Sequence, residues 1–318
     1  MSDPVLYCLL GALVLLLGGL IAMLCKTVPI AKKVYESQLV RTSPEKWGRV
    51  CSAPDNAEQL AMWNAGNRWA DAHRSVMREV QIENEGLRLF GELYDFGGER
   101  CVIILPGRCE SLCYSYYFAA PYAEAGVSVL VIDSRCHGRS DGTYSTIGVG
   151  ESRDLMAWMR FLTQECGKTA LFLHCICIGS NAAMLAMARP DCPKALRGFV
   201  SEGCYTTFRE TFRTHMIADH RPLFPVLDLV MLEIYRHTGT NVLRDSPLRS
   251  IRKVRTPALF LFGEQDVFSR PDKSRKLFAA CGSADKRLVW MPQGGHSHLR
   301  INNTEAYDRA VKEFVLSR

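Results

Sequence analysis

The sequence has no strong excess of charge, because 39 basic and 33 acidic residues leave a net charge of +6 over 318 residues. A surplus this mild and dispersed does not predict a nucleic-acid partner. Internal repeats and low-complexity stretches are also missing, so a repeat architecture is not indicated. The composition, 47% hydrophobic and 23% charged, is that of a globular protein with a sizeable core.

The thirteen cysteines have no regular spacing, and no C-x-x-C pair occurs among them. An odd number without regular spacing does not resemble a disulfide framework, and in a chain of this size it indicates a reducing compartment. The missing C-x-x-C pair also weakens the case for a structural zinc site.

Charged residues are missing from Val5 to Leu24, where leucine, valine, isoleucine and alanine dominate. About 20 apolar residues suffice to cross a bilayer as a helix. A cleaved signal peptide is the alternative, but Asp3 and no basic residue precede the run, and no A-x-A site follows it. We therefore predict a retained single-pass transmembrane anchor over residues 1–25.

Basic residues occur just after the predicted span and not before it, at Lys26, Lys32, Lys33 and Arg41. By the positive-inside rule, this asymmetry places the rest of the chain in the cytoplasm. The many free cysteines agree with that orientation, and an extracytoplasmic domain is the alternative.

Residues 26–78 are expected to form a juxtamembrane linker and a helical lead-in. Asp55 can cap a helix, and large apolar residues recur along the stretch that follows, including Leu60, Trp63 and Trp69. We expect this lead-in to pack against the next domain, with a role as a substrate gate as the alternative.

Eight stretches of the sequence are predicted to form strands. Residues 79–83 and 87–94 read as two strands joined by a tight turn. Residues 101–105 are continuously apolar, as a strand covered on both faces requires. The remaining strands are expected at 127–132, 169–173, 196–201, 257–262 and 287–291.

The stretch His174-Cys175-Ile176-Cys177-Ile178-Gly179 lies between a predicted strand and a run of helix formers at 182–188. Strand, sharp turn and helix form the context of a nucleophile elbow, G-x-S-x-G. On that pattern Cys177 takes the place of the nucleophile and Cys175 that of the first glycine. Small residues are needed on both sides because the turn is tight and strained.

The residues after the predicted strand at 127–132 read D-x-R-x-H-G-x-S-x-G, from Asp133 to Gly142. Followed by Gly148-Val149-Gly150-Glu151 and Asp154–Trp158, this motif order resembles a family of bacterial α/β-hydrolases, the membrane-anchored relatives of the serine aminopeptidase-like and esterase-like group. The resemblance extends from the N-terminal helix through residue 318. It implies an α/β-hydrolase fold over 79–318, with an eight-stranded, mostly parallel sheet, flanking helices and a small helical cap at about 206–250.

The resemblance also implies a catalytic triad in the order nucleophile, acid and base, made by Cys177, Asp266 and His296. Glu264 is the lesser candidate for the acid, and His298 is the lesser candidate for the base. The motif residues Arg135 and His137 are expected to brace the loops beside the site.

Two backbone N–H groups are expected to form an oxyanion hole. One belongs to Ile178, the residue after the nucleophile, and the other to the loop after the strand at 101–105. In that loop Arg108 is the first candidate and Cys109 the second. Pro106 stands where a histidine is usual, so the loop is atypical.

These positions predict an acyl hydrolase that acts through a thioester on a small ester, thioester or amide. Dienelactone hydrolases of this fold resemble the chain in carrying cysteine at the elbow. The thiolate is the reactive form of cysteine, and a protonated histidine or a helix N-terminus stabilises it. No cofactor is implied, the expected partners are a small acyl substrate and the membrane, and the oligomeric state is left open.

Three alternatives stay open: a catalytically weak homologue that binds a ligand, a thiol-based redox or metal sensor, and a cysteine-dependent acyltransferase. The sensor hypothesis depends on cysteines that follow predicted strands, because the carboxyl ends of parallel strands share one edge of a sheet. These are Cys109, Cys136, Cys175, Cys177 and Cys204.

Overall fold

The computed structural model describes residues 4–318 and is built on one eight-stranded sheet with the strand order β1-β2-β4-β3-β5-β6-β7-β8. The first three strands in this order pair antiparallel, and all later neighbours pair parallel. The strands are β1 (Met77–Asn84), β2 (Leu87–Tyr94), β3 (Arg100–Leu105), β4 (Ser128–Ile132), β5 (Ala170–Ile176), β6 (Leu196–Glu202), β7 (Ala258–Gly263) and β8 (Lys286–Met291). The predicted α/β-hydrolase fold is confirmed.

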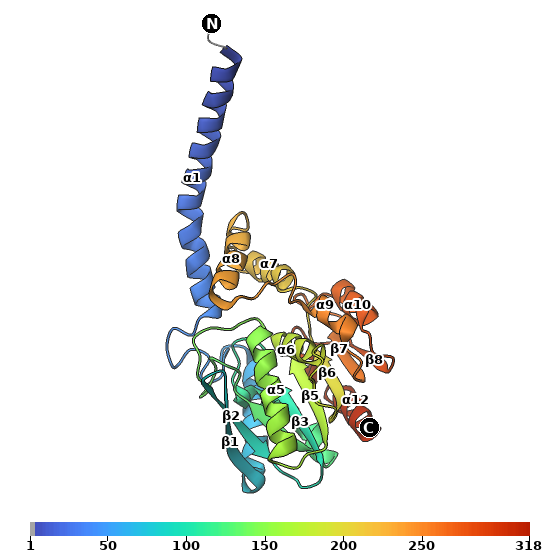
Figure 1. The fold of residues 1–318 in the computed structure, drawn as a ribbon. Coiled ribbons are helices and arrows are strands. Elements are labelled where there is room, and N and C mark those ends of the chain that lie inside the picture. The colour runs from blue at the N-terminus through green and yellow to red at the C-terminus, as the bar shows by residue number, and fades with distance from the viewer. Residues whose placement is uncertain (1–3) are drawn as a thin grey trace.

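Helices follow most of the strands and cover the sheet (Figure 1). The α-helices are α1 (Pro4–Leu39), α2 (Ala57–Ala72), α3 (Leu112–Ser115), α4 (Ala120–Glu124), α5 (Val149–Gln164), α6 (Ile178–Met187), α7 (Phe208–Ala218), α8 (Val226–Thr238), α9 (Pro247–Ser250), α10 (Pro271–Ala280), α11 (Leu299–Asn302) and α12 (Thr304–Leu316). The expected cap at 206–250 contains α7, α8 and α9.

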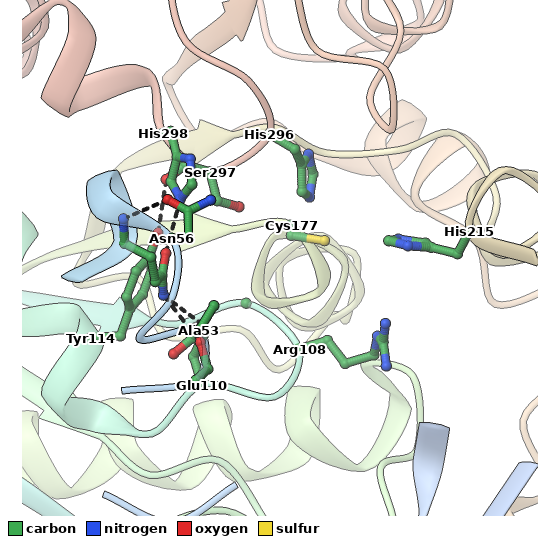
Figure 2. A pocket seen from close by; sticks show the side chains of 13 residues that line it. Ala53, Asn56, Arg108, Glu110, Tyr114, Cys177, His215, His296, Ser297 and His298 are labelled. Carbon is green, nitrogen blue, oxygen red and sulfur yellow. Dashed lines mark hydrogen bonds between the residues drawn. The ribbon is translucent and has the colours of Figure 1, made fainter. Parts of the chain in front are cut away.

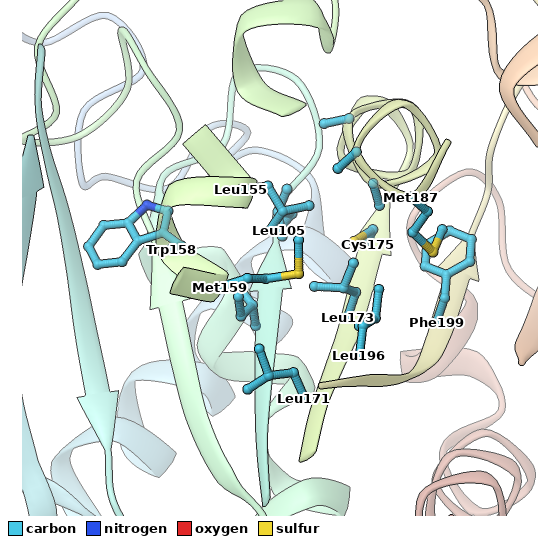
Figure 3. Close-up of a cluster of buried hydrophobic side chains, with 14 of the residues drawn as sticks. Leu105, Leu155, Trp158, Met159, Leu171, Leu173, Cys175, Met187, Leu196 and Phe199 are labelled. Atoms are coloured by element: carbon cyan, nitrogen blue, oxygen red, sulfur yellow. The ribbon is translucent and has the colours of Figure 1, made fainter. Parts of the chain in front are cut away.

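The two faces of the sheet carry separate apolar clusters, which explains the continuous apolar runs in the central strands. On one face, side chains of β3 and β5 pack against α5 and α6, with Leu105, Leu155 and Cys175 among them (Figure 3). On the other face, α2, α4 and α12 cover the sheet, and Tyr122 and Tyr307 are fully buried there. The carboxyl ends of the parallel strands are therefore held rigidly from both sides.

The long helix α1 has two parts with different surroundings. Its apolar part is exposed from Val5 to Ile21, and α1 is the one helix of residues 4–318 that is long and apolar enough to cross a membrane. Its lower end is buried against α8 through Ala31, Val34 and Leu39, as Figure 1 shows for the two helices. Residue 25, where we expected the anchor to end, lies inside this helix, and residues 26–39 of the expected juxtamembrane linker continue it.

The lead-in after α1 is helical from Ala57 to Ala72 and packs against the segment that follows β3. Its N-cap is Asn56, whose side chain accepts a hydrogen bond from the backbone N–H of Gln59, and not Asp55 as we expected. Both Asn56 and Gln59 lie beside the cavity described below.

Candidate active site

Cys177 occupies the sharp turn between β5 and α6 with φ 52° and ψ −111°. A positive φ is costly for a side chain other than glycine and persists only where the surroundings enforce it. Here the backbone N–H of Cys177 donates to the carbonyl of Glu202 on β6, with N and O 2.9 Å apart. The turn therefore has the strained geometry of a nucleophile elbow.

The residues on either side of Cys177 show why small side chains are required. A Cβ atom at Gly179 would lie 2.9 Å from the carbonyl oxygens of Leu105 and Pro106, so only glycine fits without moving the backbone. Cys175, at the position of the first glycine, is fully buried under α6 in the apolar cluster of Figure 3. The departure from the motif at Cys175 is therefore accommodated by core packing.

His296 and Asp266 form a hydrogen-bonded pair at the same edge of the sheet. The Nδ1 of His296 lies 2.8 Å from the Oδ2 of Asp266. The other oxygen, Oδ1, accepts hydrogen bonds from the backbone N–H groups of Phe268 at 2.8 Å and Ser269 at 2.7 Å. The carboxylate is therefore fixed in position and fixes the orientation of the imidazole ring.

Burial and charge act in opposite directions on this pair. Burial would raise the pKa of Asp266, but the charge and hydrogen bond of His296 outweigh it and lower that pKa. Burial would lower the pKa of His296, but the charges of Asp266 and Cys177, together with hydrogen bonds to both, raise it well above its usual value. The imidazolium form of His296 is therefore favoured at neutral pH beside the Cys177 sulfur.

The two lesser triad candidates lie elsewhere. Glu264 is exposed, and its backbone N–H donates to the carbonyl of Met291. His298 turns toward α2, where its Nε2 lies 2.9 Å from Gln59 Oε1 and its Nδ1 lies 3.1 Å from Glu58 Oε2. The structure thus brings Cys177, His296 and Asp266 together, and it directs His298 to the lead-in.

The loop after β3 passes directly over Cys177, since a Cβ atom at Gly107 would lie 3.7 Å from the Cβ of Cys177. Ile178 begins α6, and the first N–H groups of a helix have no partner within it. The guanidinium of Arg108 is held by the carbonyl of Gln38 at 3.1 Å and its Oε1 at 3.0 Å. The end of α1 therefore positions the residue expected to supply the second oxyanion N–H.

A cavity of about 230 Å³ opens beside Cys177. Figure 2 shows the sulfur of Cys177 with the rings of His296 and His215 and the side chain of Arg108 around it. The far wall is mostly polar and comes from the lead-in, from the segment that follows β3 and from the loop after β8. Its residues are Ser52, Ala53, Asn56, Gln59, Glu110, Tyr114, Ser297 and His298.

Glu110 is the most unusual residue of this wall. Its Oε1 accepts hydrogen bonds from the Ser52 hydroxyl and, at 3.0 Å, from the Gln59 amide, whereas its Oε2 is buried without a partner in the described chain. Burial raises the pKa of Glu110 to about 7. The wall therefore contains a buried carboxyl oxygen that the described residues leave without a hydrogen-bond partner.

Sequence reasoning missed both Glu110 and His215. His215 comes from the cap helix α7, stacks on Phe268 with ring centroids 4.1 Å apart, and has its pKa lowered to about 3 by burial and the charge of Arg108. No sequence motif identifies either residue. The only signal was that Glu110 is a charged side chain in the loop after β3, which was already expected to line the site.

A buried polar chain lies behind the elbow. The hydroxyls of Tyr122 and Tyr307 lie 3.0 Å from His174 Nδ1 and 2.9 Å from His174 Nε2, and the Tyr307 hydroxyl also donates to Glu202 Oε2. Burial lowers the pKa of His174 to about 3 and raises that of Glu202 to about 7. His174 is therefore a neutral structural residue, and Glu202 is a second carboxyl near the triad.

Of the five cysteines named for a sensor, Cys177 is the one that lines the cavity in the described part of the chain. Burial raises the pKa of Cys136, Cys175 and Cys204 well above that of an ordinary thiol. Within residues 4–318, no group of three histidine, cysteine or carboxylate side chains could hold a metal ion. The motif residue Arg135 binds Asp154 at 2.7 Å through two nitrogens, which agrees with a bracing role.

Comparison with known proteins supports the same family. The family model described as serine aminopeptidase, S33, matches residues 98–227 and 243–302, more than half of the chain. The uncharacterised Bacillus subtilis protein YqkD is 24% identical over 216 residues, covering 67% of this chain and 70% of its own. An uncharacterised membrane protein of Saccharomyces cerevisiae is 25% identical, over 62% of this chain and 63% of its own.

Solved structures with low identity share the fold. The Pyrococcus furiosus esterase Pf2001 superposes with a TM-score of 0.62 at 20% identity, over 75% of this chain and 90% of that one. The α/β-hydrolase GrgF of Penicillium sp. sh18 superposes with a TM-score of 0.58 at 16% identity, over 75% and 97% of the two chains. The chain therefore belongs to the serine aminopeptidase S33 family of α/β-hydrolases.

Proposed function

We propose that this protein is a membrane-anchored acyl hydrolase that cleaves a small ester, thioester or amide through Cys177, His296 and Asp266. The observation that carries the proposal is the placement of Cys177 in a strained elbow beside a histidine fixed by a buried carboxylate. A cysteine there replaces the serine in the family's name, and the raised pKa of His296 suits the change. An imidazolium stabilises a thiolate, which attacks without a general base.

Acylation begins when the Cys177 thiolate attacks the carbonyl carbon of the substrate and a carbon–sulfur bond forms. The carbonyl oxygen becomes an oxyanion, and the backbone N–H groups of Ile178 and Arg108 donate hydrogen bonds to it. The imidazolium of His296 then gives its proton to the departing alcohol, thiol or amine, and the bond to the leaving group breaks. The products of this step are a thioester on Cys177 and a neutral His296.

Deacylation uses the same residues in the opposite proton direction. Neutral His296 takes a proton from water as the oxygen attacks the thioester carbon. The tetrahedral intermediate collapses, the carbon–sulfur bond breaks, and the carboxylic acid leaves with the thiolate restored. Asp266 keeps the imidazole in one tautomer and stabilises its charge throughout.

The lining of the cavity bears on the substrate class. A volume of about 230 Å³ suits a small acyl donor, and the wall that carries Glu110, Gln59 and Asn56 favours a polar group on it. Because this wall comes partly from the lead-in, the substrate lies between the hydrolase domain and a segment outside the family match.

The proposal also includes the location of the protein. Residues 5–24 form a single membrane span, and Lys26, Lys32 and Lys33 on the domain side place the domain in the cytoplasm by the positive-inside rule. This orientation rests on the distribution of charge along the sequence. Protease accessibility of the domain in inverted vesicles would test it.

Acyl transfer to Cys177 can be tested by mass spectrometry of the full chain in detergent. The protein is mixed with a panel of activated esters and thioesters, quenched in acid, and compared with Cys177→Ala and His296→Ala. We expect one acyl adduct on Cys177 that forms more slowly without His296. Release of free acid in water, against transfer to an added amine or alcohol, separates a hydrolase from an acyltransferase.

Cys109→Ala is the matched control, because this thiol follows β3 at the same end of the sheet and its pKa is raised by burial. It should leave the adduct unchanged. Labelling that persists without Cys177, or falls equally on several cysteines, would contradict the proposal.

A further inference from the structure

We infer that the connection between α7 and α8, residues 219–225, is a second membrane contact that lies in the interfacial layer of the bilayer crossed by α1. The inference rests on the proposed anchoring by α1, and it does not require Cys177 to be active. The occupant of this surface is a lipid bilayer, because the surface adjoins the end of the apolar span.

Contacts fix the level of α8 relative to α1. The rings of Tyr35 and His237 stack with centroids 4.9 Å apart. Further down, the Thr240 hydroxyl donates to the carbonyl of Thr146 at 2.9 Å, and the neighbouring Ser145 N–H donates to the carbonyl of Leu39 at 2.9 Å. Later residues of α8 therefore meet later residues of α1, so the two helices run in the same direction.

The start of α8 follows from this alignment. Val226 lies eleven residues before His237, and Leu24 lies eleven residues before Tyr35. Both helices rise about 1.5 Å per residue, so Val226 lies level with Leu24, the last residue of the apolar run. In Figure 1, α8 stands beside the lower part of α1, on the side of the domain from which α1 projects.

The exposure of residues along α1 supports this alignment of Val226 with Leu24. Residues 4–22 are exposed, whereas Met23 and Leu24 are half-buried, as are Thr27 and Val28. This stripe continues at helical spacing into the buried Ala31 and the rest of the contact with α8. The exposure of α1 therefore begins to fall in the final turn of the apolar run.

The position of the bilayer then determines where the connection at residues 219–225 lies. Residues 5–24 number about the 20 that cross the hydrocarbon core as a helix, so one boundary of that core falls near Leu24. Residues 219–225 precede Val226 and lie at or above this level. They must therefore meet the headgroup layer on the side where the domain stands.

The side chains of the connection suit that layer. Phe224 is 78% exposed, and Ile217 at the end of α7 is 47% exposed. Arg221 forms an ion pair with Asp219 at 3.2 Å, and His220 is exposed. An exposed aromatic side chain beside polar and charged ones suits the interfacial layer of a membrane. In water the same exposure of Phe224 would be unfavourable.

The connection also belongs to the packed unit that borders the site. Leu223 packs on the apolar cluster formed by α1, α7 and α8, and Cys177 and Ile178 pack on that same cluster. Contact with the bilayer through residues 219–225 would therefore hold this wall of the site at a fixed place relative to the membrane.

The test uses the full chain with Phe224→Trp in vesicles of phosphatidylcholine and phosphatidylglycerol whose acyl chains carry bromine, which quenches tryptophan on contact. Leu316→Trp is the matched control, because Leu316 is 57% exposed on α12, away from α1. Leu20→Trp reports on the span itself. The five native tryptophans are subtracted by measuring the unsubstituted chain in parallel.

We expect the added fluorescence to be mostly quenched for Leu20→Trp and Phe224→Trp and unchanged for Leu316→Trp, with equal thermal melting of the three variants. Quenching at Leu20→Trp without quenching at Phe224→Trp overturns this inference and leaves the anchor in place. Quenching at neither position overturns both. Because none of these results depends on activity, failure of the proposed catalysis is seen separately.

Discussion

The backbone N–H of Cys177 donates to the carbonyl oxygen of Glu202 over 2.9 Å, so the proposed nucleophile is held by a residue with a buried, titratable side chain. The Glu202 carboxyl accepts a hydrogen bond from Tyr307, and its Oε1 has no partner among residues 4–318. The elbow and this second carboxyl are therefore coupled through β6.

Glu202→Gln should change how stability depends on pH. Burial raises the pKa of Glu202 to about 7, so between pH 4.5 and 7 the folded protein keeps a proton that the unfolded chain releases. Folding stability from this group therefore falls as pH rises through that window. Glutamine cannot ionise. The free energy of unfolding of the variant, relative to that of the wild type, should therefore rise by up to about 3 kcal/mol between pH 5 and pH 8.

Thermal unfolding in detergent at both pH values measures this difference. Glu264→Gln is the control, because Glu264 is exposed and should show no such change. Parallel pH profiles for wild type and Glu202→Gln would mean that folding does not raise the pKa of Glu202.

His296→Ala should slow acylation of Cys177 by roughly 10²-fold or more, because both the stabilising imidazolium and the proton donor are lost. Asp266→Asn keeps the ring but removes the charge that raises the pKa of His296, so the imidazolium should be lost at lower pH than in the wild type. Quenched mass spectrometry measures the rate of acylation in both variants. Alkylation of Cys177 by iodoacetamide from pH 5 to 9, followed by peptide mass spectrometry, measures the pH at which the imidazolium is lost. Unchanged rates in both variants would show that Cys177 reacts independently of His296 and Asp266.

Gly179→Ala should destabilise the protein by about 1–3 kcal/mol and slow acylation, because the new methyl meets two carbonyl oxygens of the loop that passes over Cys177. Gly295→Ala, beside His296, is the matched control, since a methyl there meets nothing within 4 Å. Thermal melting and acylation rates of the two variants should differ clearly. Equal melting temperatures and equal acylation rates would show that the loop shifts to make room for the methyl group at little cost in stability.

Glu110→Gln should alter substrate preference rather than chemistry. Since its pKa is raised to about 7, Glu110 becomes charged as pH rises through neutrality. For an acyl donor with an ammonium group, we expect the wild-type KM to fall from pH 6 to pH 8 and the variant's KM to stay flat. With a neutral acyl donor of the same size, the KM values of the two proteins should not differ. If KM for the ammonium donor falls equally in both proteins, Glu110 does not take part in recognising the substrate.

Much of the fold could be predicted because its signals are local. Fully covered strands such as β3 require unbroken apolar runs, and the β1–β2 hairpin is marked by Glu85 and Gly86, both of which adopt positive φ in the structure. The positions of Cys177, Asp266 and His296 came from motifs at strand ends, and the structure brings them together. Their catalytic roles stay a prediction.

What the sequence did not reveal depends on contacts between distant segments. Gln59 meets His298 across 239 residues, and Arg108 meets Gln38 across 70. Neither pair has a local pattern, so the lead-in appeared only as a packed helix and not as a wall of the pocket. The continuation of α1 to Leu39 was hidden by the end of the apolar run and by Pro29, which lies inside the helix.

The contact between α1 and α8 limits how the enzyme could be separated from its membrane. Cleavage of the chain near Leu39 would strip cover from Val226, Val230 and Ile234, which are now buried in the apolar cluster that they share with the second half of α1. The released fragment would carry a new apolar surface and a loosened cap, and it would also lose the Gln38 partner of Arg108. Shedding by proteolysis should therefore act as inactivation and not as release of a soluble form.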